Sequence, residues 1–151
     1  MDSHDTARLL TLCQGDKDLA KLTLTLMFLQ MGSPCIYYGT EVGMAGGNDP
    51  ACRACMVWDK EEQDQKMLAF MKALIKLRKD QQPVLSYGGY AWQVDDTAQV
   101  VKLTRKKDAT KLCAVFNLGE KPYAVAPIGK TLLEQNFADG KLEKNGFVIF
   151  E

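Results

Sequence analysis

The sequence predicts an α/β segment followed by an all-β module. Apolar side chains recur at helical spacing over residues 7–31, and a short apolar run follows at residues 35–38. After Gly88 and Gly89 the apolar spacing changes to the two-residue period of strands. This change divides the chain into two predicted domains, residues 1–87 and residues 88–151.

Composition and charge narrow the class of protein. The 151 residues are 46% hydrophobic and 25% charged, which is ordinary for a globular protein. Nineteen basic residues balance nineteen acidic ones, so we expect neither nucleic acid nor a membrane surface as a partner. Residues 22–40 carry no charge, but Gly32 and Pro34 would break a membrane span there. A buried helix leading into a buried strand fits this stretch better.

The first helix should begin again at Asp16, a plausible N-cap, after a break near Gly15. Two interpretations remain for the polar start of the chain. Asp5 or Thr6 could cap the first helical turn, or the segment could be a loop that carries His4 and Asp5 into a substrate pocket.

The run at residues 35–38 is predicted to be a buried strand that ends at Gly39 and places Glu41 at the rim of a sheet. A second helix is predicted over residues 60–81, ended by Pro83. The strands of the all-β module, separated by turn signals, should be antiparallel and lie at residues 90–94, 99–105, 111–117, 123–125, 130–134 and 147–150.

Five cysteines occur in the chain, of which Cys52 and Cys55 form a CxxC pair within a glycine-rich loop at residues 42–61. Zinc needs four ligands, and no second CxxC or suitably spaced histidine is present. We therefore expect no metal and no cofactor, with reduced thiols in a cytoplasmic protein.

Three stretches together resemble the alpha-amylase family of glycoside hydrolases, within it the neopullulanase and cyclomaltodextrinase type. They are Ser3-His4-Asp5-Thr6, the segment from Gly32 to Glu41, and the loop with Asn48-Asp49-Pro50, Cys52-Arg53 and Met56-Val57-Trp58-Asp59. The resemblance implies that residues 1–87 are the last part of a (β/α)₈ TIM barrel. Residues 88–151 would then be the C-terminal antiparallel β-sandwich of that family.

The resemblance also implies roles for two residues. Asp5 matches the acidic residue that stabilises the transition state, and His4 matches the substrate-binding histidine beside it, with α-glucans or cyclomaltodextrins as substrates. A carboxylate suits this role because the transition state is oxocarbenium-like. Ser3 departs from the asparagine of many members, and Ala51 stands where an acidic residue is frequent in the subgroup.

The nucleophile and the general acid of this family come from the fourth and fifth barrel strands, which this chain does not contain. A retaining glycosidase needs the two about 5 Å apart, and a complete barrel takes about 250 residues. We therefore expect a C-terminal fragment of an enzyme, inactive in isolation. Its partner would be the missing N-terminal part of the barrel, and strand 35–38, left without neighbours, predicts self-association.

Two readings from other classes compete with an enzyme fragment. A stand-alone carbohydrate-binding module would stack Tyr90 and Trp92 on sugar rings. A cysteine-based redox or metal module ranks last. An open reading frame that extends upstream of Met1 would separate the enzyme fragment from the stand-alone module.

Overall fold

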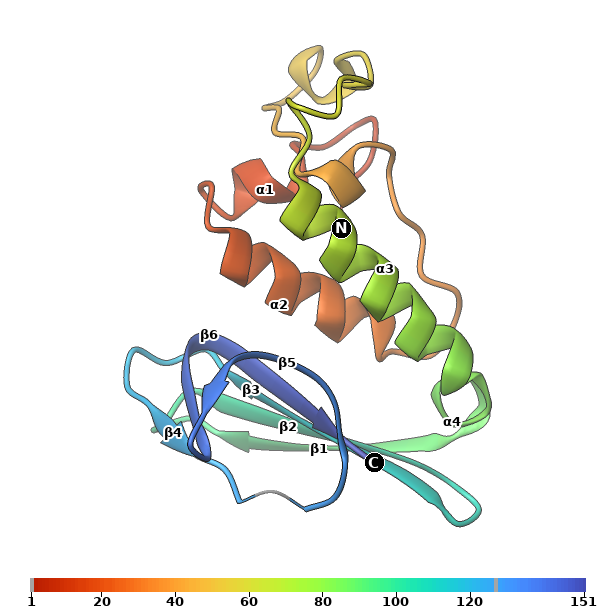
Figure 1. Ribbon diagram of the computed structural model, residues 1–151, viewed down its shortest axis with the longest axis vertical. Coiled ribbons are helices and arrows are strands. Elements are labelled where there is room, and N and C mark those ends of the chain that lie inside the picture. The colour runs from red at the N-terminus through yellow and green to blue at the C-terminus, as the bar shows by residue number, and fades with distance from the viewer. Residues whose placement is uncertain (1, 127) are drawn as a thin grey trace.

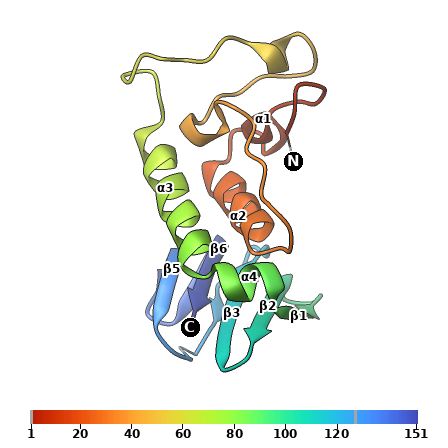
Figure 2. The same cartoon turned by 90° about the vertical axis from the view of Figure 1, so that its right-hand side faces the viewer.

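The computed structural model describes residues 2–126 and 128–151. Helices form one layer, and an antiparallel sheet packs beneath them (Figure 1). The helices are α1 (Leu9–Leu12), α2 (Lys17–Phe28), α3 (Gln65–Asp80) and α4 (Gln82–Tyr87), with short 3₁₀ helices at Thr40–Val42 and Ala51–Arg53. Figure 2 shows α2 and α3 side by side above the sheet, with α4 at the junction.

The predicted restart of the first helix at Asp16 is confirmed. The Asp16 carboxylate accepts hydrogen bonds from the backbone N–H groups of Asp18 and Leu19, both at 2.9 Å. The alternative that Asp5 or Thr6 caps the first turn is wrong. The N-cap of α1 is Arg8, and the N–H of Leu9 donates instead to the carboxylate of Asp2 at 3.0 Å.

Residues 35–38, predicted as a strand, are not one. They run as an irregular segment that pairs with no strand of the described chain. The physical reason is that a strand exists only through its ladder of hydrogen bonds, and the six strands present all pair among themselves. The predicted burial is wrong as well, because Cys35 and Tyr38 are exposed and Ile36 and Tyr37 are only half-buried.

The second long helix, α3, starts later than the predicted residue 60, and it ends at Asp80, one residue before the predicted end at residue 81. Asp64 caps α3 by accepting from the N–H of Met67 at 2.9 Å, so residues 60–64 remain in the loop. Pro83 lies in the first turn of α4, where a missing N–H costs nothing because that turn has no intrahelical acceptor.

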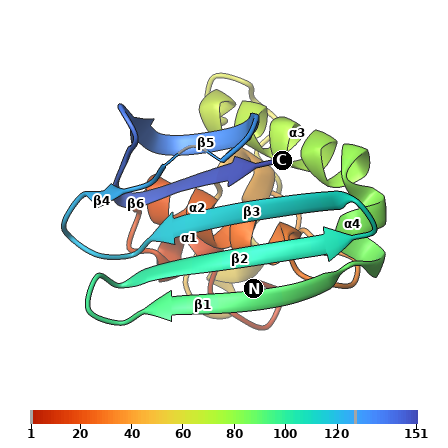
Figure 3. The same cartoon turned by 90° about the horizontal axis from the view of Figure 1, so that it is seen from below.

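The predicted antiparallel module is confirmed, with one correction to its architecture. The strands are β1 (Gly89–Asp95), β2 (Val100–Lys107), β3 (Thr110–Asn117), β4 (Tyr123–Ala124), β5 (Thr131–Ala138) and β6 (Lys141–Phe150). All six belong to one hydrogen-bonded sheet, where the sequence predicts the two sheets of a sandwich. The long strand β6 joins them because it pairs with β3, β4 and β5 (Figure 3). The last strand starts earlier than the predicted residue 147, since Asn145 and Gly146, an Asn-Gly turn signal in the sequence, lie inside β6.

Both faces of the sheet are packed. One apolar cluster joins the sheet to α2 and α4 and includes Leu22, Leu85, Leu103 and Phe147. Another lies among α1, α2 and α3, around Phe28 and Leu74. A third covers the opposite face of the sheet, around Val115, Val148 and Phe150. Packing on both faces explains how a single sheet can replace the predicted sandwich.

Two buried arginines hold the C-terminal end of α2. Arg78 donates to the carbonyl groups of Phe28, Gln30 and Gly32. Arg105, 1% exposed, reaches from β2 to the carbonyl groups of Leu29, Val84, Leu85, Gly88 and Gly89. Burial lowers the pKa of both guanidinium groups, yet arginine keeps its charge in proteins. Carbonyl oxygens that α2 and α4 leave unpaired are thereby satisfied.

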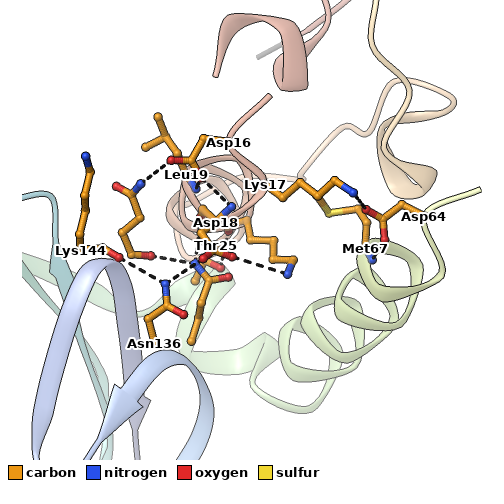
Figure 4. A network of polar contacts seen from close by, with 12 residues as sticks. Asp16, Lys17, Asp18, Leu19, Thr25, Asp64, Met67, Asn136 and Lys144 are labelled. Carbon is orange, nitrogen blue, oxygen red and sulfur yellow. Dashed lines mark hydrogen bonds and ion pairs between the residues drawn. The ribbon is translucent and has the colours of Figure 1, made fainter. Parts of the chain in front are cut away.

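A polar network fastens the N-terminal end of α2 to the sheet (Figure 4). Asn145 donates to Asp16 Oδ2 at 2.8 Å, and Asn136 donates to Asp18 Oδ2 at 3.0 Å. Both asparagines have positive φ angles, a backbone conformation that asparagine tolerates better than most residues. On the other side Lys17 lies 2.7 Å from Asp64, which ties α2 to α3.

Candidate functional site

His4 and Asp5 lie together in a turn at the helical end of the molecule. His4 Nε2 is 3.1 Å from Asp5 Oδ2, and the two side chains are 67% and 66% exposed. The turn is built locally, because the N–H of Asp5 donates to Ser3 Oγ at 3.1 Å and the N–H of Ser3 donates to Thr6 Oγ1 at 3.0 Å. Both predicted site residues thus face solvent, where a substrate can reach them.

The loop after residue 42 returns to this turn and holds it from the side. Arg53 donates its Nε–H to the backbone carbonyl of His4 at 2.9 Å, and Cys52 donates its thiol hydrogen to the same oxygen at 3.2 Å. Arg53 Nε also lies 3.0 Å from Asp49 Oδ1, and Arg53 Nη2 lies 3.7 Å from Asp5 Oδ1. The Asp5 carboxylate therefore sits between an imidazole and a guanidinium.

Sequence reasoning missed the residues that support the turn from below. Arg8 is fully buried, with its guanidinium carbon 4.7 Å and 4.6 Å from the ring centroids of Tyr37 and Tyr38. Asp2 accepts from Thr40 Oγ1 at 2.9 Å in addition to the N–H of Leu9. The only signal in the sequence was Arg8 itself, a single arginine at the edge of an apolar run. Apolar periodicity alone predicts that such a residue lies at the surface.

Tyr37 and Tyr38 belong to the segment at residues 35–38 that was predicted to be a strand. Desolvation, followed by the neighbouring Tyr38, raises the pKa of Tyr37 above its usual value. Tyr38 is 39% exposed and donates its hydroxyl to the carbonyl of Ala54 at 2.7 Å. Glu41, predicted at the rim of a sheet, lies in the 3₁₀ helix Thr40–Val42, and its Oε2 is buried without a hydrogen-bond partner.

The cysteines are not brought together around a metal. Cys52 is buried and Cys55 is exposed, and all five thiols are free. Over residues 2–126 and 128–151, no three histidine, cysteine or acidic side chains gather closely enough to hold a metal ion. Burial, with a smaller contribution from Asp16, raises the pKa of the Cys13 thiol. Of the helices in the described ranges, none has the length and apolar character to span a bilayer.

The aromatic residues of the competing carbohydrate-module reading lie on the edge strand β1. Tyr90 is 57% exposed and Trp92 is 39% exposed. They share the sheet face that packs against the helices, since they pair with Arg105 and Leu103 of β2, but the helices do not cover them. An edge strand with exposed aromatic side chains is a surface for binding a partner or a ligand.

Both the turn with His4 and Asp5 and the loop after residue 42 lie in a region that matches a known protein family. The family model described as "Alpha amylase, catalytic domain" matches residues 1–88. The intracellular maltogenic amylase of Bacillus subtilis strain 168 is 52% identical over 120 residues, which cover 79% of this chain and 20% of that protein. Neopullulanase 2 of Thermoactinomyces vulgaris is 35% identical over 139 residues, covering 89% of this chain and 24% of that protein.

Solved structures agree. The maltogenic amylase from S. marinus superposes with a TM-score of 0.82 at 28% identity, covering 98% of this chain and 21% of that one. The chain thus spans about a fifth to a quarter of the length of these relatives. Because the family model covers more than half of the 151 residues, this chain belongs to the alpha-amylase family.

Proposed function

We propose that this chain is the C-terminal part of a longer retaining glycoside hydrolase that acts on α-glucans or cyclomaltodextrins. Asp5 stabilises the transition state, and His4 binds the substrate beside it. The observation that carries this proposal is the exposed pair of His4 and Asp5, 3.1 Å apart, whose backbone is held by Arg53. The family membership of the chain supports the same reaction class.

The chemistry requires a preorganised negative charge near the sugar. An oxocarbenium-like transition state carries positive charge on the ring, and a fixed carboxylate stabilises it more than it stabilises the ground state. The Ser3 hydroxyl holds the backbone N–H of Asp5, and Arg53 Nη2 lies 3.7 Å from the Asp5 carboxylate, so both contacts favour one orientation of this side chain. The nucleophile and the general acid come from the upstream part of the enzyme, with residues 1–87 completing the barrel and residues 88–151 forming its C-terminal β domain.

Exposed apolar surface supports an upstream partner within the same protein. Tyr90, Trp92 and Val94 form an exposed stripe on β1, next to the face that α2 and α4 cover. The apolar faces of α2 and α3 are largely covered, because the two helices pack on each other and on the sheet. We assign the stripe to the upstream part. The isolated chain should self-associate through it, and the five free thiols suit a cytoplasmic enzyme.

The second candidate is a stand-alone carbohydrate-binding module, and the exposure of Tyr90 and Trp92 favours it. The two candidates differ in where glucan binds. Affinity electrophoresis in a gel containing soluble starch distinguishes them, since retardation of the isolated chain that Trp92→Ala abolishes supports the module. Unchanged mobility of the chain and of the variant supports the enzyme part.

A chimera tests the proposed function. The matching C-terminal region of the Bacillus subtilis maltogenic amylase is replaced by this chain, and starch hydrolysis is measured with and without Asp5→Asn. We expect hydrolysis by the chimera, loss of it in Asp5→Asn, and none from the isolated chain. Asp108→Asn, an exposed aspartate on the β2–β3 hairpin, is the matched control and should leave hydrolysis unchanged. A folded chimera in which Asp5→Asn retains full activity would contradict the role of Asp5.

A further inference from the structure

We propose that Arg8 is a positioning residue that holds His4 and Asp5 in place through Tyr38 and the loop at residues 52–54. The importance of this placement for catalysis rests on the proposed function above. The placement itself rests on contacts within this chain, and it is measurable without any hydrolysis.

The first step is the unusual setting of Arg8. Its side chain is 0% exposed, and its guanidinium lies against the rings of both Tyr37 and Tyr38. Nη1 donates to the carbonyl of Tyr38, and the backbone N–H of Arg8 donates to the carbonyl of Gly46 at 2.9 Å. No ion pair of the described residues includes Arg8. The residue is therefore held by cation–π contacts with two rings and by a carbonyl group. A guanidinium can stack flat on a ring and donate to the carbonyl at once, whereas an ammonium group has no flat face to stack.

The second step is that the contacts form a closed path. Tyr38 donates its hydroxyl to the carbonyl of Ala54, and the adjacent Arg53 donates to the carbonyl of His4. Cys52 donates to that same carbonyl oxygen. Arg8 follows Asp5 by three residues, so the backbone joins it to the turn. From Arg8 the contacts run to Tyr38, then to the loop at residues 52–54, and from there back to His4.

The third step concerns the other edge of the guanidinium. Nε and Nη2 of Arg8 are buried and have no hydrogen-bond partner. A buried N–H without a partner is costly, and an apolar side chain of similar size would avoid that cost. Packing alone therefore does not account for an arginine here. The contacts of Arg8 with the ring and the carbonyl group of Tyr38 account for it. Tyr38 in turn donates to Ala54, so these contacts link Arg8 to the loop at residues 52–54.

Two probes in this chain report on the turn directly. His4 is the only histidine, so its imidazole resonances in an NMR spectrum belong to the site without ambiguity. Cys52 is fully buried while its thiol donates to His4, so its rate of alkylation reports how often the loop leaves the turn. The reaction at each of the five cysteines is followed separately by peptide mass spectrometry.

The test compares Arg8→Lys with Arg78→Lys in this chain. Arg78 is also buried and donates to backbone carbonyl groups, but it lies on α3 and contacts the C-terminal end of α2. We expect Arg8→Lys to raise the alkylation rate of Cys52 by about tenfold and to shift the His4 resonances, because lysine loses the stack and the loop opens more often. Arg78→Lys should change neither readout, even where it lowers stability.

Tyr38→Phe gives a second test that keeps both rings. It removes only the hydroxyl that donates to Ala54, and we expect Cys52 to react about threefold faster. A folded Arg8→Lys protein with both readouts unchanged would overturn the proposal. If Arg8→Lys does not fold, unchanged readouts in Tyr38→Phe would overturn it. A chimera without Asp5-dependent hydrolysis would refute the proposed function alone, and these structural readouts would still stand.

Discussion

Arg53 donates its Nε–H to the backbone carbonyl of His4 at 2.9 Å, across 49 positions of sequence. This bond joins the glycine-rich loop to the turn that carries Asp5. Arg53 Nε also lies 3.0 Å from Asp49 Oδ1, so one guanidinium contacts both the loop and the turn. An exposed ion pair such as Arg53–Asp49 contributes little to the free energy of unfolding. The hydrogen bond from Arg53 to His4 matters instead for the position of the turn relative to the loop.

Gly39→Ala should destabilise the chain more than Gly15→Ala. Both glycines have φ near +80°, but a Cβ at Gly39 would collide with Met44 Sδ, whereas Gly15 has nothing within 4 Å. We expect Gly15→Ala to cost about 1 kcal/mol, and Gly39→Ala to cost about 1–3 kcal/mol more, in urea unfolding. The double variant Gly39→Ala with Met44→Ala should recover part of the difference. Equal costs for the two glycines would show that the close approach of Met44 to Gly39 does not constrain the turn after Tyr38.

Arg105→Met should weaken the attachment of the helices to the sheet. The substitution leaves the carbonyl groups of Leu29, Leu85 and Gly88 buried without a donor, and we expect a loss of about 2–4 kcal/mol in the free energy of unfolding. Lys107→Met on the same strand is the control, with an expected change within about 0.5 kcal/mol. Similar small losses for both variants, measured by denaturant titration, would argue against Arg105 as the central attachment.

The pH dependence of stability should contain a contribution from Asp64. The hydrogen bond from Lys17, helped by the N–H of Met67, lowers the pKa of the Asp64 carboxyl. A lowered acid pKa means that the native state favours the charged form, so this contribution is present above the unfolded pKa of about 3.9. It is lost as the pH falls through the lower native pKa. Asp64→Asn should therefore lower stability at pH 7 and flatten the loss of stability below about pH 4.

Thermal unfolding from pH 7 to pH 2.5 measures this contribution, with Asp80→Asn as the control because Asp80 is an exposed helix residue paired with Lys76. Parallel profiles for the original chain and Asp64→Asn would contradict the assignment.

Local signals in the sequence predicted the helices well because their causes are local. Asp16 caps α2 from its own side chain, and leucine spacing defines the buried face. The helix boundary at Asp64 was missed, since acidic residues at 61 and 62 gave an equally good local signal. Pro83 was predicted to end the second helix, and α3 does end before it, but the sequence did not predict α4, in whose first turn Pro83 lies.

Long-range contacts account for what the sequence could not predict. A strand at residues 35–38 depends on neighbours that periodicity does not supply. Arg105 and Arg8 are buried because backbone carbonyl groups and aromatic rings distant in sequence surround them. His4 and Asp5 were chosen from a motif, whereas Cys52 and Arg53 contact them only through the course of the folded loop.

The kinetics of Asp5→Asn in the full-length enzyme test the central claim most directly. Asparagine keeps the shape of the side chain and removes its negative charge, so a carboxylate that acts mainly in the transition state should lower kcat by at least about 10³-fold with little change in KM. The measurement is a set of initial rates over a range of maltodextrin concentrations, with Asp108→Asn as the control. A normal kcat with a raised KM would contradict the claim, because Asp5 would then only bind the substrate.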